Sequence, residues 1–148
     1  MGIENNNNEI IEEMGAFFNA RAETYNEVHL GHVGGMESKE LIASFLPDHT
    51  KTLVDFGIGT GLELEAIFKR FPDVEVTGID LADNMLQLLK ETYSNRNITL
   101  HCMSYFDFDF GKNQYDAAIS VQTMHHYPHH EKIALYRRIY DSIKENGV

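Results

Sequence analysis

The stretch Asp55-Phe56-Gly57-Ile58-Gly59-Thr60-Gly61 decides the fold, because three glycines alternate directly after an apolar run. That run, residues 51–58, is typical of a buried strand, and residues 62–71 after the turn have the apolar spacing of an amphipathic helix. Glycine lets a backbone turn tightly and approach a ligand closely, and the first turn of a helix offers unpaired N–H groups. The sequence therefore predicts a strand, a ligand-binding turn and a helix in this order.

The rest of the chain continues the alternation of strand and helix. Strands are expected at residues 74–80, 98–104 and 115–122, helices at 82–93 and 130–144, and two earlier helices at 10–25 and 37–45. Strands separated by helices of this length pair in parallel and carry helices on both faces of the sheet. We therefore expect an α/β fold with a doubly wound, mostly parallel sheet, which binds ligands outside the carboxyl ends of its strands.

Composition narrows the classes of protein. The 148 residues are 43% hydrophobic, enough for one buried core, and carry a formal charge of −11 from 23 acidic and 12 basic residues. Such a charge argues against nucleic acid or anionic membranes as partners, because phosphate binding needs clustered Lys and Arg. Cys102 is the only cysteine, and no apolar run approaches the ~20 residues that span a bilayer. A cytoplasmic protein is expected.

The glycine turn does not fit a dinucleotide site. A G-x-G-x-x-G turn cradles a pyrophosphate, but counting from Gly57 places Leu62 at the third glycine position, and counting from Gly59 places Leu64 there. The spacing D-x-G-x-G-x-G instead resembles the first motif of class I S-adenosylmethionine-dependent methyltransferases. The resemblance covers residues 25–147 and implies a Rossmann-like fold. It also implies that Asp55 and the glycine backbone, with Thr60, hold the zwitterionic amino-acid end of the cofactor.

The second acidic site is Asp80, at the end of the next expected strand and 19 positions beyond Gly61. At this offset a carboxylate grips ribose hydroxyls, and Leu81 follows it where a 2′-phosphate site would carry a basic residue. Asp80 as a helix cap is the alternative reading, and Asp83 is expected as a cap or first-turn acid.

The resemblance implies further contacts to the cofactor. Ser104 and Tyr105 stand where these enzymes contact the adenine; many relatives carry Asp at the first position, so Asp107 or Asp109 is the alternative for the N6 contact. Gln122 is expected beside the methionine or ribose portion. Residues 18–26 look like the N-terminal signature of small-molecule methyltransferases, in which Tyr25 closes over the cofactor. A core aromatic with its hydroxyl at the surface is the other reading of Tyr25.

The histidines at residues 125–130 give the candidate catalytic groups. His125 or His126 can take a proton from an acceptor hydroxyl or amine, because histidine titrates near neutral pH. A structural histidine is the alternative, since the sulfonium is already an activated methyl donor and positioning supplies much of the catalysis. No metal is expected, because Pro128 breaks the helix that would align ligands.

The sequence thus favours methyl transfer to a small-molecule acceptor by in-line displacement. A module that binds the cofactor without catalysis and a nicotinamide-dependent Rossmann oxidoreductase are the alternatives. Residues 1–9 are expected to form a disordered tail and residues 10–148 one domain that lacks its C-terminal strands, with Val148 beginning a fifth strand. Such a fragment would expose a sheet edge and be unstable alone or paired as a homodimer.

Overall fold

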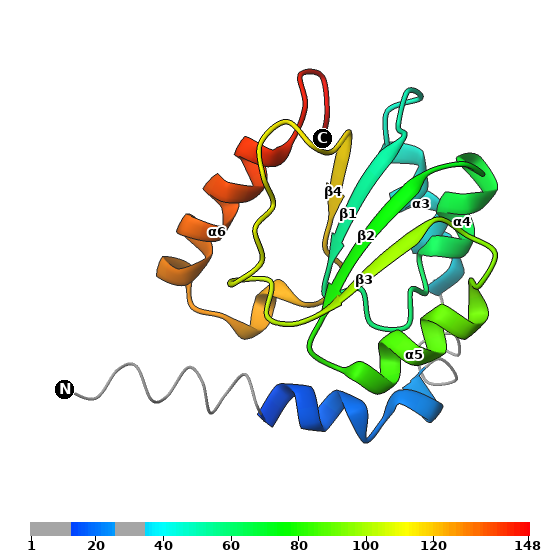
Figure 1. The fold of residues 1–148 in the computed structure, drawn as a ribbon, viewed down its shortest axis with the longest axis vertical. Coiled ribbons are helices and arrows are strands. Elements are labelled where there is room, and N and C mark those ends of the chain that lie inside the picture. Colours follow the sequence, from blue (N-terminus) through cyan, green and yellow to red (C-terminus); the bar gives the residue numbers. More distant parts are fainter. Residues whose placement is uncertain (1–12, 26–34) are drawn as a thin grey trace.

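The computed structural model describes residues 13–25 and 35–148, and the expected tail over residues 1–9 lies outside them. Residues 13–19 and 22–25 are helical. The elements that follow are α3 (Gly35–Phe45), β1 (Thr52–Phe56), α4 (Leu64–Arg70), β2 (Glu75–Asp80), α5 (Asp83–Thr92), β3 (Ile98–Cys102), β4 (Ala117–Ile119), the short 3-10 helix η1 (Met124–His126) and α6 (His129–Ser142). The predicted alternation of strand and helix is confirmed (Figure 1).

The four strands form one parallel sheet in the order β3-β2-β1-β4. The chain places β2 and β3 on one side of β1 and then returns to place β4 on the other side. This is the doubly wound α/β arrangement that the sequence predicts. In such a sheet, ligands bind outside the carboxyl ends of the strands where the strand order reverses, which here lies between β1 and β4.

Helices cover both faces of the sheet (Figure 1). Because side chains alternate along a strand, Leu53 of β1 packs in a cluster with residues of α3, α4 and α5, whereas Val54 packs in a second cluster with residues of α6. Both side chains are 0% exposed. Burying an aliphatic side chain of this size contributes about 1.5–3 kcal/mol, so the two clusters fix β1 as the centre of the fold.

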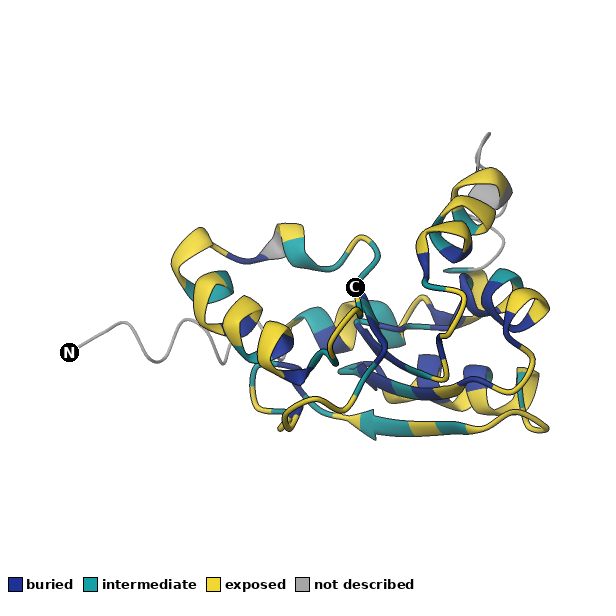
Figure 2. Cartoon of the chain, turned by 90° about the horizontal axis from the view of Figure 1, so that it is seen from above, coloured by how far each residue is buried: buried dark blue, intermediate teal, exposed yellow. Residues whose placement is uncertain are grey.

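The two edge strands differ. No residue of β3 is fully buried, and Figure 2 shows this strand at the lower margin in the colours of intermediate and exposed residues. Beside β4, the Val148 N–H donates to the Asp116 carbonyl at 3.1 Å, and the Ala118 N–H donates to the Val148 carbonyl at 2.8 Å. Val148, expected to begin a further strand, therefore already pairs with β4.

Asp116 links the start of β1 to Lys144, which follows α6, at the amino end of the sheet. Its Oδ2 accepts hydrogen bonds from the Lys51 N–H at 2.9 Å, the Thr52 N–H at 2.9 Å and the Thr52 hydroxyl at 3.0 Å. Its Oδ1 lies 3.2 Å from Nζ of Lys144. Burial alone would raise the pKa of Asp116, but these donors outweigh it and lower the pKa to about 2.

This depressed pKa predicts an acid-sensitive contribution to stability. The contribution of Asp116 is present above the pKa of about 4 that an unfolded aspartate has, and it is lost as the pH falls toward about 2 in the folded protein. We expect Asp116→Asn to lower the free energy of unfolding by roughly 2 kcal/mol at neutral pH and by far less near pH 2. Urea denaturation of both proteins across this range measures the difference. A difference that stays constant from neutral to acid pH contradicts the assignment.

Candidate functional site

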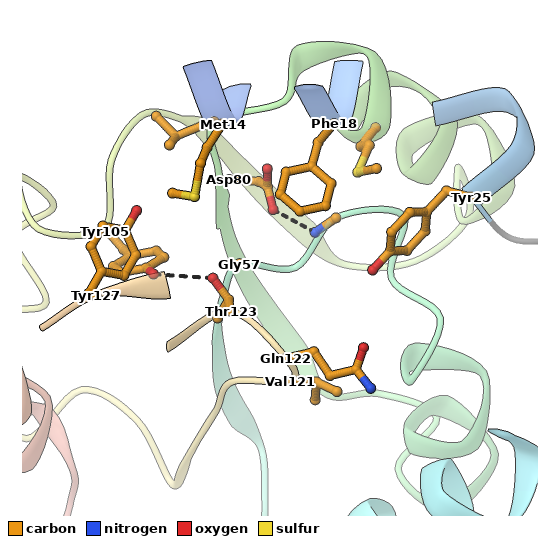
Figure 3. Close-up of a pocket in the computed structure, with 13 residues that line it drawn as sticks. Met14, Phe18, Tyr25, Gly57, Asp80, Tyr105, Val121, Gln122, Thr123 and Tyr127 are labelled. Carbon is orange, nitrogen blue, oxygen red and sulfur yellow. Dashed lines mark hydrogen bonds between the residues drawn. The ribbon is translucent and has the colours of Figure 1, made fainter. Parts of the chain in front are cut away.

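A cavity opens at the carboxyl ends of the strands, between the glycine turn and the N-terminal helical residues. It lies where the reversal of strand order predicts a ligand (Figure 3). Its lining residues are Met14, Phe18, Tyr25, Gly57, Gly59, Asp80, Leu81, Met85, Tyr105, Val121, Gln122, Thr123 and Tyr127.

The glycine turn needs glycine at its first position for two reasons. Gly57 has a φ of 81°, a left-handed conformation that other residues rarely adopt. A Cβ on Gly57 would lie 2.6 Å from three atoms of the Thr123 side chain, far inside contact distance. Gly59 also has a positive φ, of 54°, and it directs its N–H toward β2. The turn therefore brings bare backbone to the wall of the cavity.

Asp80 joins the turn to the end of β2. Its Oδ2 accepts a hydrogen bond from the Gly59 N–H at 2.8 Å, and its Oδ1 accepts one from the Ala82 N–H at 2.9 Å. Burial raises the pKa of Asp80, and these backbone donors oppose the rise. Asp80 therefore organises the loops around it and also presents a carboxylate to the cavity, as Figure 3 shows.

Asp55 lies beneath the turn and does not line the cavity. It is 0% exposed, and its nearest titratable partner is Glu63, which is 5% exposed and lies just before α4. Burial, followed by the charge of Glu63, raises the pKa of Asp55 well above its usual range. Lys39 of α3 is the nearby positive charge. The glycine turn therefore lies above a buried acidic pair.

The segment after β4 closes the other wall. The Thr123 hydroxyl and the Tyr105 hydroxyl share a hydrogen bond of 3.1 Å, drawn in Figure 3. The Tyr105 and Tyr127 rings meet edge to face at 5.8 Å between their centroids. Burial is the largest cause that raises the pKa of both tyrosines, so their hydroxyls stay protonated and act as hydrogen-bonding groups.

The N-terminal helical residues cover the opening. The Asn84 N–H donates to Oδ1 of Asn19 at 3.0 Å, which holds this segment against the start of α5. Met14 and Phe18 then face the cavity from above, and Tyr25 reaches it from the following turn (Figure 3). Burial, with the nearby charges of Glu63 and Asp80, raises the pKa of Tyr25. The cover is therefore apolar over the strands and polar beside the acidic groups.

Comparison with known proteins decides the family. A family model described as a methyltransferase domain matches residues 53–147, more than half of the chain. The chain belongs to this family. The resemblance predicted from the D-x-G-x-G-x-G turn is thereby confirmed.

Curated proteins similar to this chain are also named methyltransferases. Over 96 residues the chain is 25% identical to the malonyl-[acyl-carrier protein] O-methyltransferase of Acetivibrio thermocellus, covering 65% of this chain and 33% of the relative. The curated relatives are longer proteins, and the chain spans a third of this one.

Solved structures share the fold. The DhpI complex with SAH superposes with a TM-score of 0.76 at 17% identity, over 93% of this chain and 66% of that one. Phosphoethanolamine N-methyltransferase 1 of Haemonchus contortus, in complex with phosphoethanolamine and S-adenosylhomocysteine, also gives 0.76 at 17% identity, over 93% and 31% of the two chains. The predicted Rossmann-like fold is confirmed.

The methyltransferase domain brings most of the predicted site residues together at the cavity. Those that line it are Tyr25, Gly57, Gly59, Asp80, Leu81, Tyr105 and Gln122. Asp55, Thr60, Gly61 and Ser104 are buried behind the lining. The Ser104 hydroxyl accepts a hydrogen bond from the Phe106 N–H at 3.3 Å. Asp107 and Asp109 are exposed and do not line the cavity, and Asp109 accepts a bond from the Gly111 N–H at 2.9 Å.

His125 does not line the cavity. η1 carries His125, whose side chain is exposed, and the backbone of His126. His129 and His130 begin α6, as expected. Within the described ranges 13–25 and 35–148, no three His, Cys, Asp or Glu side chains gather as a metal site would require.

Other lining residues were not predicted from the sequence. They are Met14, Phe18, Met85 and Tyr127, whereas Val121 and Thr123 lie in the segment 120–126, which the resemblance implies lines the methyl-transfer pocket. The apolar spacing of residues 10–22 marks Met14 and Phe18 as buried, but it does not say that they face a ligand cavity. Thr123 follows the expected strand by one residue, and its position above Gly57 depends on the backbone of Gln122. Gln122 has a φ of 56°, a rare conformation outside glycine that often marks a functional site.

Proposed function

We propose that this chain binds S-adenosyl-L-methionine in the cavity and transfers its methyl group to a small-molecule acceptor. One observation carries the proposal: the Asp80 carboxylate and the bare backbone of Gly57 and Gly59 border the same cavity. A carboxylate accepts the two O–H groups of a ribose, and the turn leaves room for the amino-acid end of the cofactor.

The charges of the site suit this cofactor better than a dinucleotide. Asp55, Glu63 and Asp80 surround the turn, so a pyrophosphate would meet buried acidic groups, whereas an ammonium group would be attracted to them. The buried acid and the missing Cβ of Gly57 both fit a zwitterionic ligand held by backbone and carboxylates. The nicotinamide-dependent alternative is therefore not favoured. Binding without catalysis remains the second candidate, because the same residues would serve it.

When bound, the cofactor supplies a sulfonium whose methyl group is already activated for displacement. The chain contributes orientation and exclusion of water. Met14 and Phe18 cover the cavity, and the hydrogen bond between Tyr105 and Thr123 fixes its opposite wall. Orienting donor and acceptor in line accounts for a large part of the rate gain in such reactions. His125 or His126, two and three residues beyond Thr123, is the group proposed to take a proton from the acceptor.

The names of the relatives include a small-molecule acceptor and acceptors on proteins. They are trans-aconitate 2-methyltransferase, malonyl-[acyl-carrier protein] O-methyltransferase and release factor glutamine methyltransferase. We propose a small metabolite as the acceptor, with neither nucleic acid nor membrane as partner and with a homodimer as an oligomeric form to test. The composition supports this, since the chain carries a net charge of −11.

We also propose a cytoplasmic location. Cys102 is exposed and unpaired, which suits a reducing compartment. Across residues 13–25 and 35–148, none of the helices combines the length and the apolar character that crossing a bilayer requires.

Turnover tests the function. The full chain is incubated with S-adenosylmethionine and a panel of small carboxylic acids, thioesters and amines, and release of S-adenosylhomocysteine is followed. We expect release above background with one acceptor class, and its loss in Asp80→Ala. If the folded chain binds the cofactor but releases no product with any acceptor, a binding module without catalysis is favoured instead.

A further inference from the structure

The buried pair of Asp55 and Glu63 has an unusual hydrogen-bonding environment. Asp55 is 0% exposed, and among the described residues neither of its carboxylate oxygens meets an N–H or hydroxyl donor. Its contact is the carboxyl of Glu63. Two carboxyl groups form a hydrogen bond only when one of them carries a proton, and two buried carboxylates side by side cannot both ionise without large cost. The pair therefore holds a proton in its present surroundings.

Charged groups on every neighbouring element act on this pair. Lys39 of α3 favours the ionised form of Glu63, and its Nζ is buried without a hydrogen bond in the described part of the chain. Asp80, at the end of β2, opposes ionisation of Asp55. The charge of Glu63 contributes to the rise in the pKa of Tyr25 and of Tyr93. Lys39 is thus one positive charge near the three acidic groups Asp55, Glu63 and Asp80. We infer that a second positive charge is needed before the pair loses its proton.

We propose that the Asp55 and Glu63 pair holds one proton in the free protein and releases it to solvent when the ammonium group of the cofactor binds beside the glycine turn. The reaction balances as one carboxylic acid and one carboxylate plus the ligand ammonium, giving two carboxylates, the bound ammonium and one proton in solution. An opposite charge within about 4–6 Å lowers the pKa of a carboxyl by about 1–3 units, which is the direction needed for release. This inference rests on the proposed function.

Glu63 thereby has a role that its position in the sequence alone does not suggest. Asp55 belongs to the motif, whereas Glu63 lies two residues beyond the last glycine of the turn. Glu63 keeps Asp55 neutral until the ligand arrives, so that the site does not hold two uncompensated buried charges in the free protein. Binding is then expected to weaken as the pH falls through the range in which the free pair is protonated and the bound pair is not.

Calorimetry with S-adenosylhomocysteine measures the proton directly. The full chain is titrated at about pH 6.5, where the amino group of the ligand is already charged, in two buffers of different ionisation enthalpy. The difference in observed heat gives the number of protons released. We expect about one per ligand for the wild type. Glu63→Gln should release fewer protons than the wild type, because it removes the charge of Glu63 and its amide donates to the Asp55 carboxylate, while burial still raises the pKa of Asp55.

Matched variants separate the pair from other groups. Glu65 of α4 is exposed and two residues away, so Glu65→Gln should release protons as the wild type does. Asp55→Asn gives a second test of the pair, since its amide donates to Glu63, and it should also reduce the release. The histidines are the same in all four proteins, so they do not contribute to the differences between them.

The outcomes distinguish a failure of the shared-proton proposal from a failure of the proposed function. Ligand binding by the wild type without proton release, or equal release by Glu63→Gln and wild type, overturns the shared proton and leaves the proposed function standing. Absence of any binding of S-adenosylhomocysteine by the folded wild type overturns the proposed function, and the proton release with it.

Discussion

Asp80→Ala is expected to weaken the binding of S-adenosylhomocysteine about 100-fold. The carboxylate accepts hydrogen bonds from the N–H groups of Gly59 and Ala82 at 2.8 and 2.9 Å, so its removal loosens the turn as well as losing the proposed ribose contact. A hydrogen bond to a charged group contributes about 1.5–3 kcal/mol, and about 2.7 kcal/mol corresponds to a 100-fold change in affinity. Calorimetric titration of both proteins measures the ratio.

Asp83 provides the matched control for this substitution. It is exposed in the first turn of α5, and its Oδ2 accepts a hydrogen bond from Gln87 Nε2 at 2.7 Å, away from the cavity lining. Asp83→Ala should therefore bind the ligand as the wild type does. Equal affinities for Asp80→Ala and Asp83→Ala would show that Asp80 serves only as a structural group at the end of β2.

Gly57→Ala is expected to abolish ligand binding and to destabilise the fold. The left-handed backbone at φ 81° costs an alanine about 1–2 kcal/mol, and the new Cβ would lie 2.6 Å from the Thr123 side chain. Overpacking of this kind costs a further 1–3 kcal/mol or so. Thr123 must move, which breaks its hydrogen bond to Tyr105 and distorts the cavity wall. We expect a loss of about 2–5 kcal/mol in denaturant unfolding.

Gly111→Ala is the control that separates the cost of backbone strain from damage to the ligand site. It has a φ of 66°, and a Cβ there would lie 2.9 Å from the Cγ of Gln114, an exposed side chain that can move. Gly111→Ala should lose about 1–2 kcal/mol of stability and keep full affinity. Should Gly57→Ala also keep full affinity, the glycine turn would not form part of the ligand site.

Much of the fold follows from local pattern. The apolar runs and amphipathic spacing predict each strand and helix, because the central strands are buried on both faces and the helices on one. The strand before η1 is the exception, since residues 115–122 were expected and β4 covers only Ala117–Ile119. Tyr115 pairs instead with Ile143, and the positive φ of Gln122 ends the extended backbone.

The residues of the candidate site likewise divide into those that the sequence predicts and those that it does not. Asp80 and the glycines can be predicted because their chemistry depends on strand ends and fixed offsets along the chain. Glu63 cannot, because a glutamate in an amphipathic stretch is usually solvent-exposed, and its burial here depends on α3 packing over the turn. The apolar cover by Met14 and Phe18 depends likewise on how the N-terminal residues dock against α5.

The most direct measurement is calorimetric titration of the full wild-type chain with S-adenosylmethionine, S-adenosylhomocysteine and NAD. The account predicts saturable binding of both sulfur nucleosides and no binding of NAD, because the cavity is bordered by the Asp80 carboxylate and its glycine turn lacks the G-x-G-x-x-G spacing of a pyrophosphate site. Binding of NAD alone, or no binding of any of the three by the folded chain, would contradict it.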